Sequence, residues 1–206
     1  MLRSNRTEFE KVARSERHRV SLGMDPIITP RLRLVAATAT LTQLEIEHLP
    51  QFFKQLRVEP APDWPSDNLR DVLPFFRDQL AGNASLVGWL SWYWILDESD
   101  GAKLVGGGGF KGAPSDGMVE IGYEVRAACR GKGYATEAVG AQVAWAMSHP
   151  DVLRVIAETH IDNAASMGVL KKLGFRPVGP GSEHELLRFE RRTDRDVDVD
   201  TFSQPS

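Results

Sequence analysis

The sequence has little of what marks membrane, secreted or metal-cluster proteins. Its 206 residues include a single cysteine, Cys129, which excludes an internal disulfide and a metal cluster built from cysteines. The longest apolar stretch, 86–96, is about half as long as the ~20 residues of a membrane-spanning helix, and Gly88 and Ser91 interrupt it. We therefore expect a protein of a reducing, cytoplasmic compartment that does not span a membrane.

The sequence also lacks an excess of charge of either sign. It has 25 Lys and Arg against 28 Asp and Glu, a formal net charge of −3, so nothing global attracts nucleic acid or an anionic membrane. The segment 1–23 is rich in Arg but has no apolar core of the kind a secretory signal needs. A polyanionic ligand must therefore be held by a local group of residues.

What is present is ordinary globular composition, 42% hydrophobic and 26% charged, which is enough for one sizeable core. Both ends differ from this composition. The N-terminal residues lack a dense apolar face, and Asp recurs at alternate positions near the C-terminus. We predict one domain over 24–190, a mobile charged extension over 1–23 and a mobile acidic tail over 191–206.

Several segments alternate apolar and polar residues or are rich in β-branched and aromatic residues, which indicates strands. The clearest is 118–125, where Glu120 and Glu124 fall on the face opposite the apolar residues. The glycine run 106–109 permits either the close approach of another group or a bulge. The predicted strands are 31–35, 86–96, 103–110, 118–125, 153–159, 175–178 and 185–190.

Apolar residues at helical spacing predict helices between these strands. Thr40 and Gln43 form a capping box at the start of the first helix, and Pro50 interrupts that helix. Pro74 predicts a kink or a new start in the second. The predicted helices are one that starts at Thr40, then 69–80, 134–147 and 163–173. The order of all these elements predicts an α/β fold with a mixed, mostly antiparallel sheet flanked by helices.

The turn Arg130-Gly131-Lys132-Gly133 lies between a predicted strand and the helix that starts at Tyr134. Glycines in such a turn let backbone N–H groups converge, and the helix dipole adds partial positive charge, so the turn suits an anion. A plain glycine-rich turn explains the same residues, and the pattern alone leaves both interpretations open. The turn has neither the G-x-x-x-x-G-K-[ST] pattern of a Walker loop nor the glycine spacing of a dinucleotide-binding fold.

Other pieces of the chain stand in a fixed order around this turn. They are Thr29-Pro30-Arg31-Leu32-Arg33-Leu34, Glu120-Ile121-Gly122-Tyr123, the R-x-x-G-x-A signature within Arg130 to Ala138, Asn163-Ala164-Ala165-Ser166, and Leu173-Gly174-Phe175. Together they resemble the GCN5-related N-acetyltransferase family, and within it the branch of ribosomal-protein N-terminal acetyltransferases. The resemblance covers Thr29 to about Glu190 and implies the acyl-CoA N-acyltransferase fold, in which the central strands splay apart.

The resemblance implies acetyl-CoA as co-substrate and no metal. The pyrophosphate would lie on the backbone amides of 129–135. The pantetheine would pair with free backbone groups near Val125 and Ala127 like an added strand, and the N–H of Val125 would bind the thioester oxygen. Asn163 and Ser166 match family positions that contact the pantetheine or approach the sulfur. The implied cofactor-binding residues are Val125, Ala127, Arg130, Gly131, Lys132, Gly133, Tyr134, Ala135, Asn163 and Ser166.

Acetyl transfer to an amine needs an unprotonated nucleophile, although α-amines titrate near 8 and lysines near 10.4. Glu120 is the first candidate base, acting through water, because the family often places a carboxylate on this strand. Glu124 shares its face and stays a second candidate, and solvated charges explain both residues equally simply. Many relatives carry a tyrosine as general acid where this chain has Leu170. Ser166 is then the candidate acid, with a plain helix-surface serine as the alternative.

Two reactive residue types lie near these segments. Cys129 is inside the cofactor turn with no histidine beside it in sequence, so we interpret it as a packing residue rather than a nucleophile. His160 follows a strand end and either lines the acceptor site or is a loop residue.

Two functions from different classes fit these residues. The first is an N-acetyltransferase that moves acetyl from acetyl-CoA to a primary amine by direct attack in a ternary complex. The second is a non-catalytic acyl-CoA sensor, which only the missing tyrosine favours. The acceptor stays open between a small-molecule amine and a protein N-terminus, because the fold does not choose between them. We expect no nucleic-acid or membrane partner, and a homodimer stays open.

Overall fold

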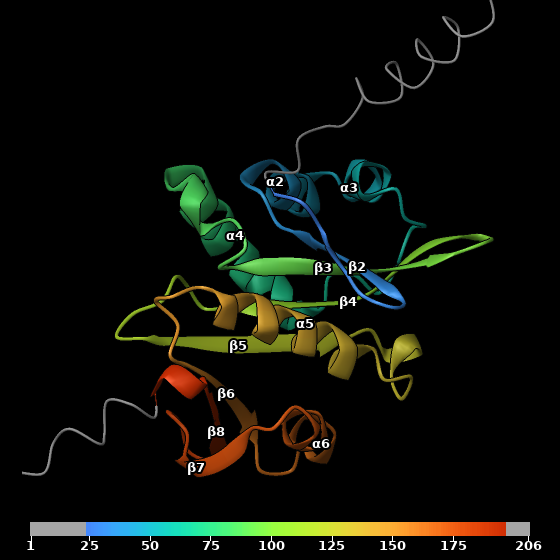
Figure 1. The fold of residues 1–206 in the computed structure, drawn as a ribbon. Helices are drawn as coiled ribbons and strands as arrows, with labels where there is room; N and C mark the ends of the chain where they lie inside the picture. The colour runs from blue at the N-terminus through green and yellow to red at the C-terminus, as the bar shows by residue number, and fades with distance from the viewer. Residues whose placement is uncertain (1–23, 197–206) are drawn as a thin grey trace, which may run out of the picture.

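The protein, seen here as a computed structural model that describes residues 24–196, is built around one eight-stranded sheet with the strand order β1-β2-β3-β4-β5-β6-β8-β7 (Figure 1). Neighbouring strands are antiparallel except β5 and β6, which are parallel. The strands are β1 (Ile27–Ile28), β2 (Leu32–Ala36), β3 (Ser91–Glu98), β4 (Gly101–Phe110), β5 (Met118–Val125), β6 (Arg154–His160), β7 (Arg176–Pro180) and β8 (Leu186–Arg192). The predicted mixed, mostly antiparallel α/β sheet is confirmed.

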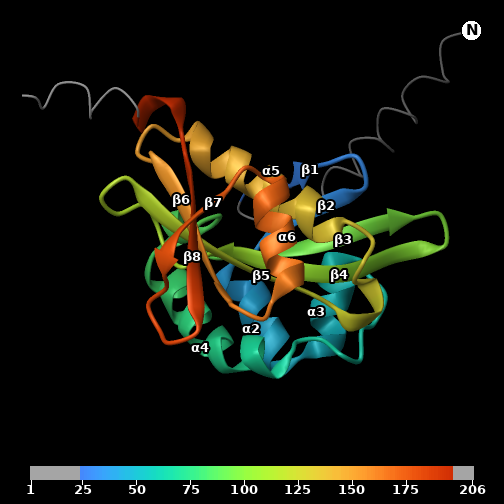
Figure 2. The same ribbon diagram turned by 90° about the horizontal axis from the view of Figure 1, so that it is seen from below.

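Helices cover both faces of the sheet (Figure 2). On one face lie α2, α3 and α4, and on the other α5 and α6. Trp92 and Trp94 of β3 pack toward α5, while Tyr93 and Ile95 pack toward α2 to α4, because successive side chains of a strand point to opposite faces. The helices are α2 (Ala39–Glu47), α3 (Leu49–Leu56), α4 (Asp67–Gly82), α5 (Tyr134–Ser148) and α6 (Ala164–Lys172), with short 3-10 turns η1 (Ala84–Leu86), η2 (Ala127–Cys129) and η3 (Asp194–Asp196).

The predicted capping box at the first helix is wrong. The cap is Thr38, whose side chain accepts a hydrogen bond from the N–H of Leu41, and Thr40 lies inside α2. α2 ends at Glu47, three residues before Pro50, and Pro50 sits in the first turn of α3, a helix that the sequence pattern missed. Proline is tolerated there because the first amides of a helix have no partner within the helix. Pro74 lies within the continuous helix α4.

The predicted strand 86–96 begins too early. β3 starts at Ser91, and the chain before it forms η1 and then turns at Gly88, whose φ of +91° is a left-handed conformation. The carbonyl of Leu90, directly before β3, accepts a hydrogen bond from the N–H of Phe110 at the end of β4, so bonding to β4 begins one residue before the strand. The short strand β1 was not predicted, since two residues carry no period.

The close-approach interpretation of the glycine run in β4 is confirmed, since a Cβ on Gly109 would overlap the backbone oxygen of Leu90. A Cβ on Gly107 would lie 3.0 Å from the Trp64 ring, and one on Gly108 would lie 2.8 Å from the Trp94 ring. The register between β3 and β4 also shifts between Trp94 and Ile95, which is a bulge. The glycines therefore let tryptophans from both faces of the sheet press against β4.

The folded chain continues beyond residue 190. β8 ends at Arg192, and the Arg195 guanidinium donates hydrogen bonds to the carbonyls of Met147 (2.6 Å) and His149 (3.1 Å) at the end of α5. The predicted extension 1–23 and most of the predicted acidic tail lie outside the described residues. No helix within residues 24–196 is long and apolar enough to cross a membrane.

Candidate active site

The parallel strands β5 and β6 pair only at the start of each strand and then separate. β5 pairs with β6 only through Met118, Val119 and Glu120. From Ile121 onward β5 keeps only its β4 partner, and β6 keeps only β8. This leaves an opening between the two strands beyond Glu120, as the predicted splay of the central strands requires.

One row of β5 backbone groups faces this opening. The carbonyl of Glu120 accepts from Lys111 (2.9 Å) and the N–H of Arg126 donates to Val105 (3.1 Å), so the even-numbered residues of this stretch bond to β4. Because backbone groups of a strand alternate in direction, the N–H of Val125 points to the side that β6 leaves. The carbonyl of Val125 accepts from Nε of Arg130 (3.1 Å). The amide that the resemblance assigns to the thioester oxygen is therefore turned toward the opening.

The turn after β5 and η2 exposes the first amides of α5. Gly131 (φ +75°) and Gly133 (φ +82°) both take the left-handed conformation, which glycine adopts at little cost. Thr38, Ser66 and Asn163 cap α2, α4 and α6 through their side chains, whereas Gly133 at the start of α5 offers no side-chain cap. A Cβ on Gly131 would meet nothing within 4 Å. Uncapped amides beside open space fit a pyrophosphate.

The other predicted cofactor residues differ in their surroundings. Arg130 and Lys132 are exposed at the turn. Tyr134 is buried, so only its backbone N–H is left for a ligand, and Ala127 uses its carbonyl within η2 to accept from the N–H of Arg130 (3.4 Å). Cys129 is half-buried against the hydrophobic core, as expected of a packing residue.

A hydroxyl pair bridges the two sides of the opening. The hydroxyls of Tyr123 on β5 and Ser166 on α6 are 2.9 Å apart, and the Asn163 side chain accepts a hydrogen bond from the N–H of Ser166 (3.0 Å). Partial burial raises the pKa of Tyr123, although the hydrogen bond to Ser166 opposes this. Tyr123 is a site residue that the sequence analysis did not propose. Its only signal was its place beside Gly122 on the clearest strand.

The structure separates the two candidate bases. Glu120 lies where β5 leaves β6, and its carboxylate forms an ion pair with the largely exposed Lys111. Glu124 lies further along β5, beside Val125, and accepts a hydrogen bond from Ser66 Oγ (2.6 Å), which also caps α4. Both carboxylates belong to the face that α2, α3 and α4 cover.

His160 and Glu185 meet on the other side of the opening. Nε2 of His160, the last residue of β6, is 3.0 Å from the Glu185 carboxylate. Glu185 has a φ of +68°, which strains a residue with a Cβ. The structure therefore places His160 in a polar pair at the strand end. Within the described residues, no three His, Cys, Asp or Glu side chains gather as metal ligands do.

A buried carboxyl on α2 was also missed. Glu45 is 1% exposed and accepts hydrogen bonds from Trp64 Nε1 (2.8 Å) and the Tyr93 hydroxyl (2.6 Å). Burial raises the pKa of Glu45 to about 7, the two hydrogen bonds oppose the shift, and the charge of Glu124 adds to it. Nothing in the spacing of α2 marks this glutamate, because its partners come from a loop and a strand.

Glu45→Gln is expected to change how stability depends on pH. The carboxyl has a higher pKa folded than unfolded, so the native protein loses stability as the pH rises from about 4.5 to about 7. The glutamine variant should lack this loss. The free energy of unfolding of the variant minus that of the wild type should therefore be roughly 2 kcal/mol more positive at pH 8 than at pH 5. Urea unfolding at the two pH values measures the difference. If the difference in free energy of unfolding between variant and wild type were the same at both pH values, Glu45 would ionise normally.

Comparison with known proteins decides the family. A family model described as "Acetyltransferase (GNAT) domain" matches residues 39–176. The chain belongs to the GNAT acetyltransferase family. It is 36% identical over 148 residues to the uncharacterized N-acetyltransferase YjdG of Bacillus subtilis (strain 168), covering 71% of this chain and 87% of that protein. It is 28% identical over 192 residues to the uncharacterized N-acetyltransferase p20 of Bacillus licheniformis, covering 87% of this chain and 96% of that protein.

Solved GNAT structures share the fold. A ribosomal L7/L12 α-N-protein acetyltransferase, RimL, in complex with coenzyme A has a TM-score of 0.58 at 20% identity, covering 84% of this chain and 100% of that one. The ribosomal-protein-S5-alanine acetyltransferase of Vibrio fischeri has a TM-score of 0.59 at 16% identity, covering 83% and 98%. This GNAT protein is therefore an acetyl-CoA-dependent N-acetyltransferase, and the sensor alternative is not favoured.

Proposed function

We propose that this N-acetyltransferase binds acetyl-CoA along the opening between β5 and β6 and transfers the acetyl group directly to a protein N-terminus. The observation that carries the proposal is the separation of β5 from β6 after Glu120, directly before the uncapped start of α5. The pyrophosphate is held by the amides of Gly131, Gly133 and the first turn of α5, including Tyr134 and Ala135. Arg130 and Lys132 supply the local positive charge that a chain of net charge −3 lacks.

The backbone and side chains at the opening hold the pantetheine. The N–H of Val125 faces the opening and is placed to bind the thioester oxygen as charge develops on it. Asn163 and Ser166 at the start of α6 line the opposite side, and Ala127 continues the β5 side. When bound, acetyl-CoA supplies the reactive thioester.

The protons of the reaction are assigned to two sites. Glu120, acting through water, accepts the proton that the attacking amine loses as its nitrogen bonds to the acetyl carbon. The C–S bond then breaks, and Ser166 gives its proton to the leaving thiolate while its oxygen takes the proton of Tyr123, which water then reprotonates. The raised pKa of Tyr123 keeps its hydroxyl protonated at neutral pH. The hydroxyl pair thus stands in for the tyrosine that Leu170 replaces.

A protein N-terminus is our choice of acceptor because the fold neighbours named above include acetyltransferases of ribosomal-protein N-termini. An α-amine also has a lower pKa than a lysine, so it needs less help from a base. The single cysteine supports a cytoplasmic location, where such acceptors are made.

A screen of amines with acetyl-CoA, read as release of free thiol, tests the acceptor. Short peptides with a free serine or alanine N-terminus should react faster than polyamines or free amino acids. The same peptides with a blocked N-terminus and a free lysine are the control and should release little thiol. Faster reaction of a polyamine would move the acceptor to the small-molecule class. If none of these amines causes thiol release although CoA still binds, the sensor hypothesis would be favoured again.

A further inference from the structure

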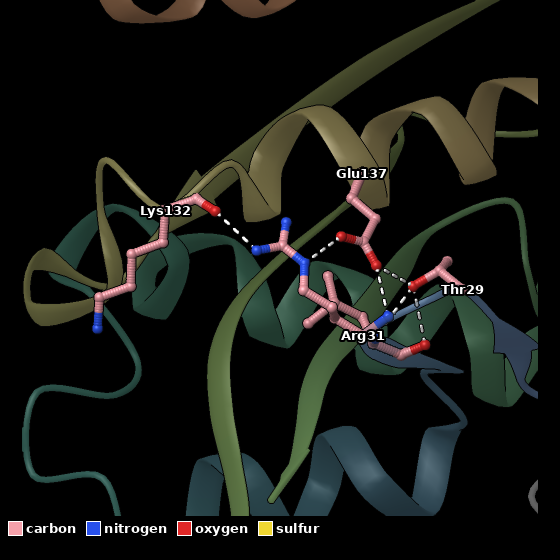
Figure 3. A network of polar contacts seen from close by, with 5 residues as sticks. Thr29, Arg31, Lys132 and Glu137 are labelled. Carbon is pink, nitrogen blue, oxygen red and sulfur yellow. Dashed lines mark hydrogen bonds and ion pairs between the residues drawn. The ribbon is translucent and has the colours of Figure 1, made fainter.

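An arginine from the start of the sheet reaches across to the cofactor turn (Figure 3). Arg31 lies between β1 and β2, and its Nη1 donates to the carbonyl of Lys132 (2.9 Å). Its Nε donates to the Glu137 carboxylate in the first turn of α5 (2.7 Å), and its guanidinium stacks 4.8 Å from the centre of the Tyr134 ring. The Arg31 guanidinium therefore contacts the cofactor turn and the start of α5 at the same time.

The hydrogen bond to Lys132 fixes one peptide plane of the turn. The C=O of Lys132 and the N–H of Gly133 belong to the same trans peptide and point in opposite directions. Since Arg31 holds the carbonyl, the N–H of Gly133 is directed away from Arg31. This peptide joins Lys132 to a residue at φ +82°, where glycine's freedom allows other orientations. An external partner is therefore what selects this orientation.

The ion pair with Arg31 neutralises the negative charge of Glu137 at the start of α5. The Glu137 side chain is 14% exposed, against 45% for Arg31. Partial burial by itself raises the pKa of Glu137, but hydrogen bonds from Thr29 and Arg31 outweigh it and lower the pKa. Glu137 is therefore a carboxylate within one helical turn of the amides assigned to the pyrophosphate. Without Arg31 it would repel that anion.

We propose that Arg31 is a positioning residue for acetyl-CoA, which it serves without contacting it, by orienting the Lys132–Gly133 peptide and neutralising Glu137. This inference rests on the proposed cofactor site at 130–135. It also gives a role to the first segment of the family resemblance, Thr29-Pro30-Arg31, because Thr29 Oγ1 donates to the same carboxylate (2.6 Å).

Arg31→Ala is expected to raise the Kd of CoA, measured by calorimetry, by about 10-fold or more, the scale of a lost charge-assisted contact. The KM for acetyl-CoA should rise by a similar factor, while kcat at saturating acetyl-CoA changes less than about 3-fold. Arg33→Ala is the matched control, since Arg33 is on the same chain segment but pairs with Asp97 (3.0 Å). That variant should bind CoA as the wild type does.

A second background shows whether Arg31 acts through Glu137. In the Glu137→Gln protein the repulsion is gone, so adding Arg31→Ala should cost at least about 3-fold less CoA affinity than it costs in the wild type. An equal cost in both backgrounds would show that Arg31 does not act by neutralising Glu137, which overturns that half of the positioning role. Unchanged CoA binding by Arg31→Ala beside a wild type that binds would overturn the whole role. A wild type that binds no CoA would instead refute the proposed cofactor site, and the inference with it.

Arg31→Lys keeps the inference testable if the alanine variant does not fold, as judged from its ligand-free melting curve. Lysine keeps the charge but lacks the fork that bonds two acceptors at once. The Kd of the lysine variant for CoA should lie between those of the wild type and the alanine variant. If the alanine variant does not fold and has no measurable Kd, the Kd of the lysine variant should still be higher than that of the wild type. Affinity equal to the wild type's would show that the bond to Lys132 is not needed, contrary to the proposal.

Discussion

Replacing Gly133 by valine is expected to abolish the thermal stabilisation that CoA gives the protein. Gly133 adopts φ +82°, which a β-branched residue avoids, so the valine must shift the turn. A Cβ there would also lie 3.4 Å from the Arg31 guanidinium, which holds the neighbouring carbonyl. The amides would then no longer converge on one anion. Melting curves with and without CoA measure the loss, since a ligand at 100 times its Kd stabilises by about 2.7 kcal/mol.

Gly82→Ala is the control for this experiment. Gly82 ends α4, and a Cβ on it would meet nothing within 4 Å, so alanine fits. This variant should keep the full CoA-induced shift in melting temperature. If the valine variant keeps it too, the pyrophosphate binds elsewhere than on the turn after β5.

The elements that were predicted well are those whose signals are local. Alternation over 118–125 predicts β5 with both of the ends it has in the structure, because one strand face is buried and the other is not. The glycines of the cofactor turn and Gly174 after α6 mark positions of positive φ, which few other residues adopt. Such signals need no knowledge of distant residues.

The errors arose where a distant contact decides. Thr38 and Thr40 are both suitable caps in sequence, but the N–H of Ala37 bonds to the carbonyl of Ser91 on β3 (2.8 Å), so the chain stays extended up to Thr38 and the helix starts there. The apolar run 86–96 looked uniform, but the chain turns at Gly88 and first bonds to β4 at Leu90, whose carbonyl accepts from the N–H of Phe110. Composition over a short window contains neither fact.

The candidate site shows the same division more sharply. Its backbone part was predicted from the motif, since the turn and the strand before it are continuous in sequence. The pairings between its side chains were not predicted, although Ser166 was a candidate, because Tyr123 and Ser166 are 43 positions apart and Arg31 and Glu137 are 106 apart. Arg31 and Glu137 meet because α5 packs across the sheet against β2, and Tyr123 and Ser166 meet because α6 packs against β6, the sheet neighbour of β5. No spacing rule contains that information.

Replacing Glu120 by glutamine is expected to lower kcat at neutral pH by about 10²-fold, the usual scale of general-base assistance. Glutamine keeps the size of the side chain but cannot accept the proton that the attacking amine must lose. The Kd of CoA should stay unchanged, because Glu120 lies where β5 still pairs with β6 rather than at the cofactor turn. Part of the lost rate should return at high pH, where the acceptor is already deprotonated. The measurement is kcat against pH at saturating acetyl-CoA.

Glu124→Gln, measured beside it, decides which carboxylate acts. Glu124 shares the face of Glu120, but its carboxylate is held by the hydrogen bond from Ser66 at the start of α4, so its loss should disturb that contact rather than proton transfer. We therefore expect a kcat close to the wild type's and a pH profile of the same shape. If instead Glu124→Gln flattens the pH profile and Glu120→Gln leaves it unchanged, the base is the carboxylate beside Val125. Glu120 would then serve only as the partner of Lys111, because a residue that accepts the proton must leave its mark on the pH dependence of kcat.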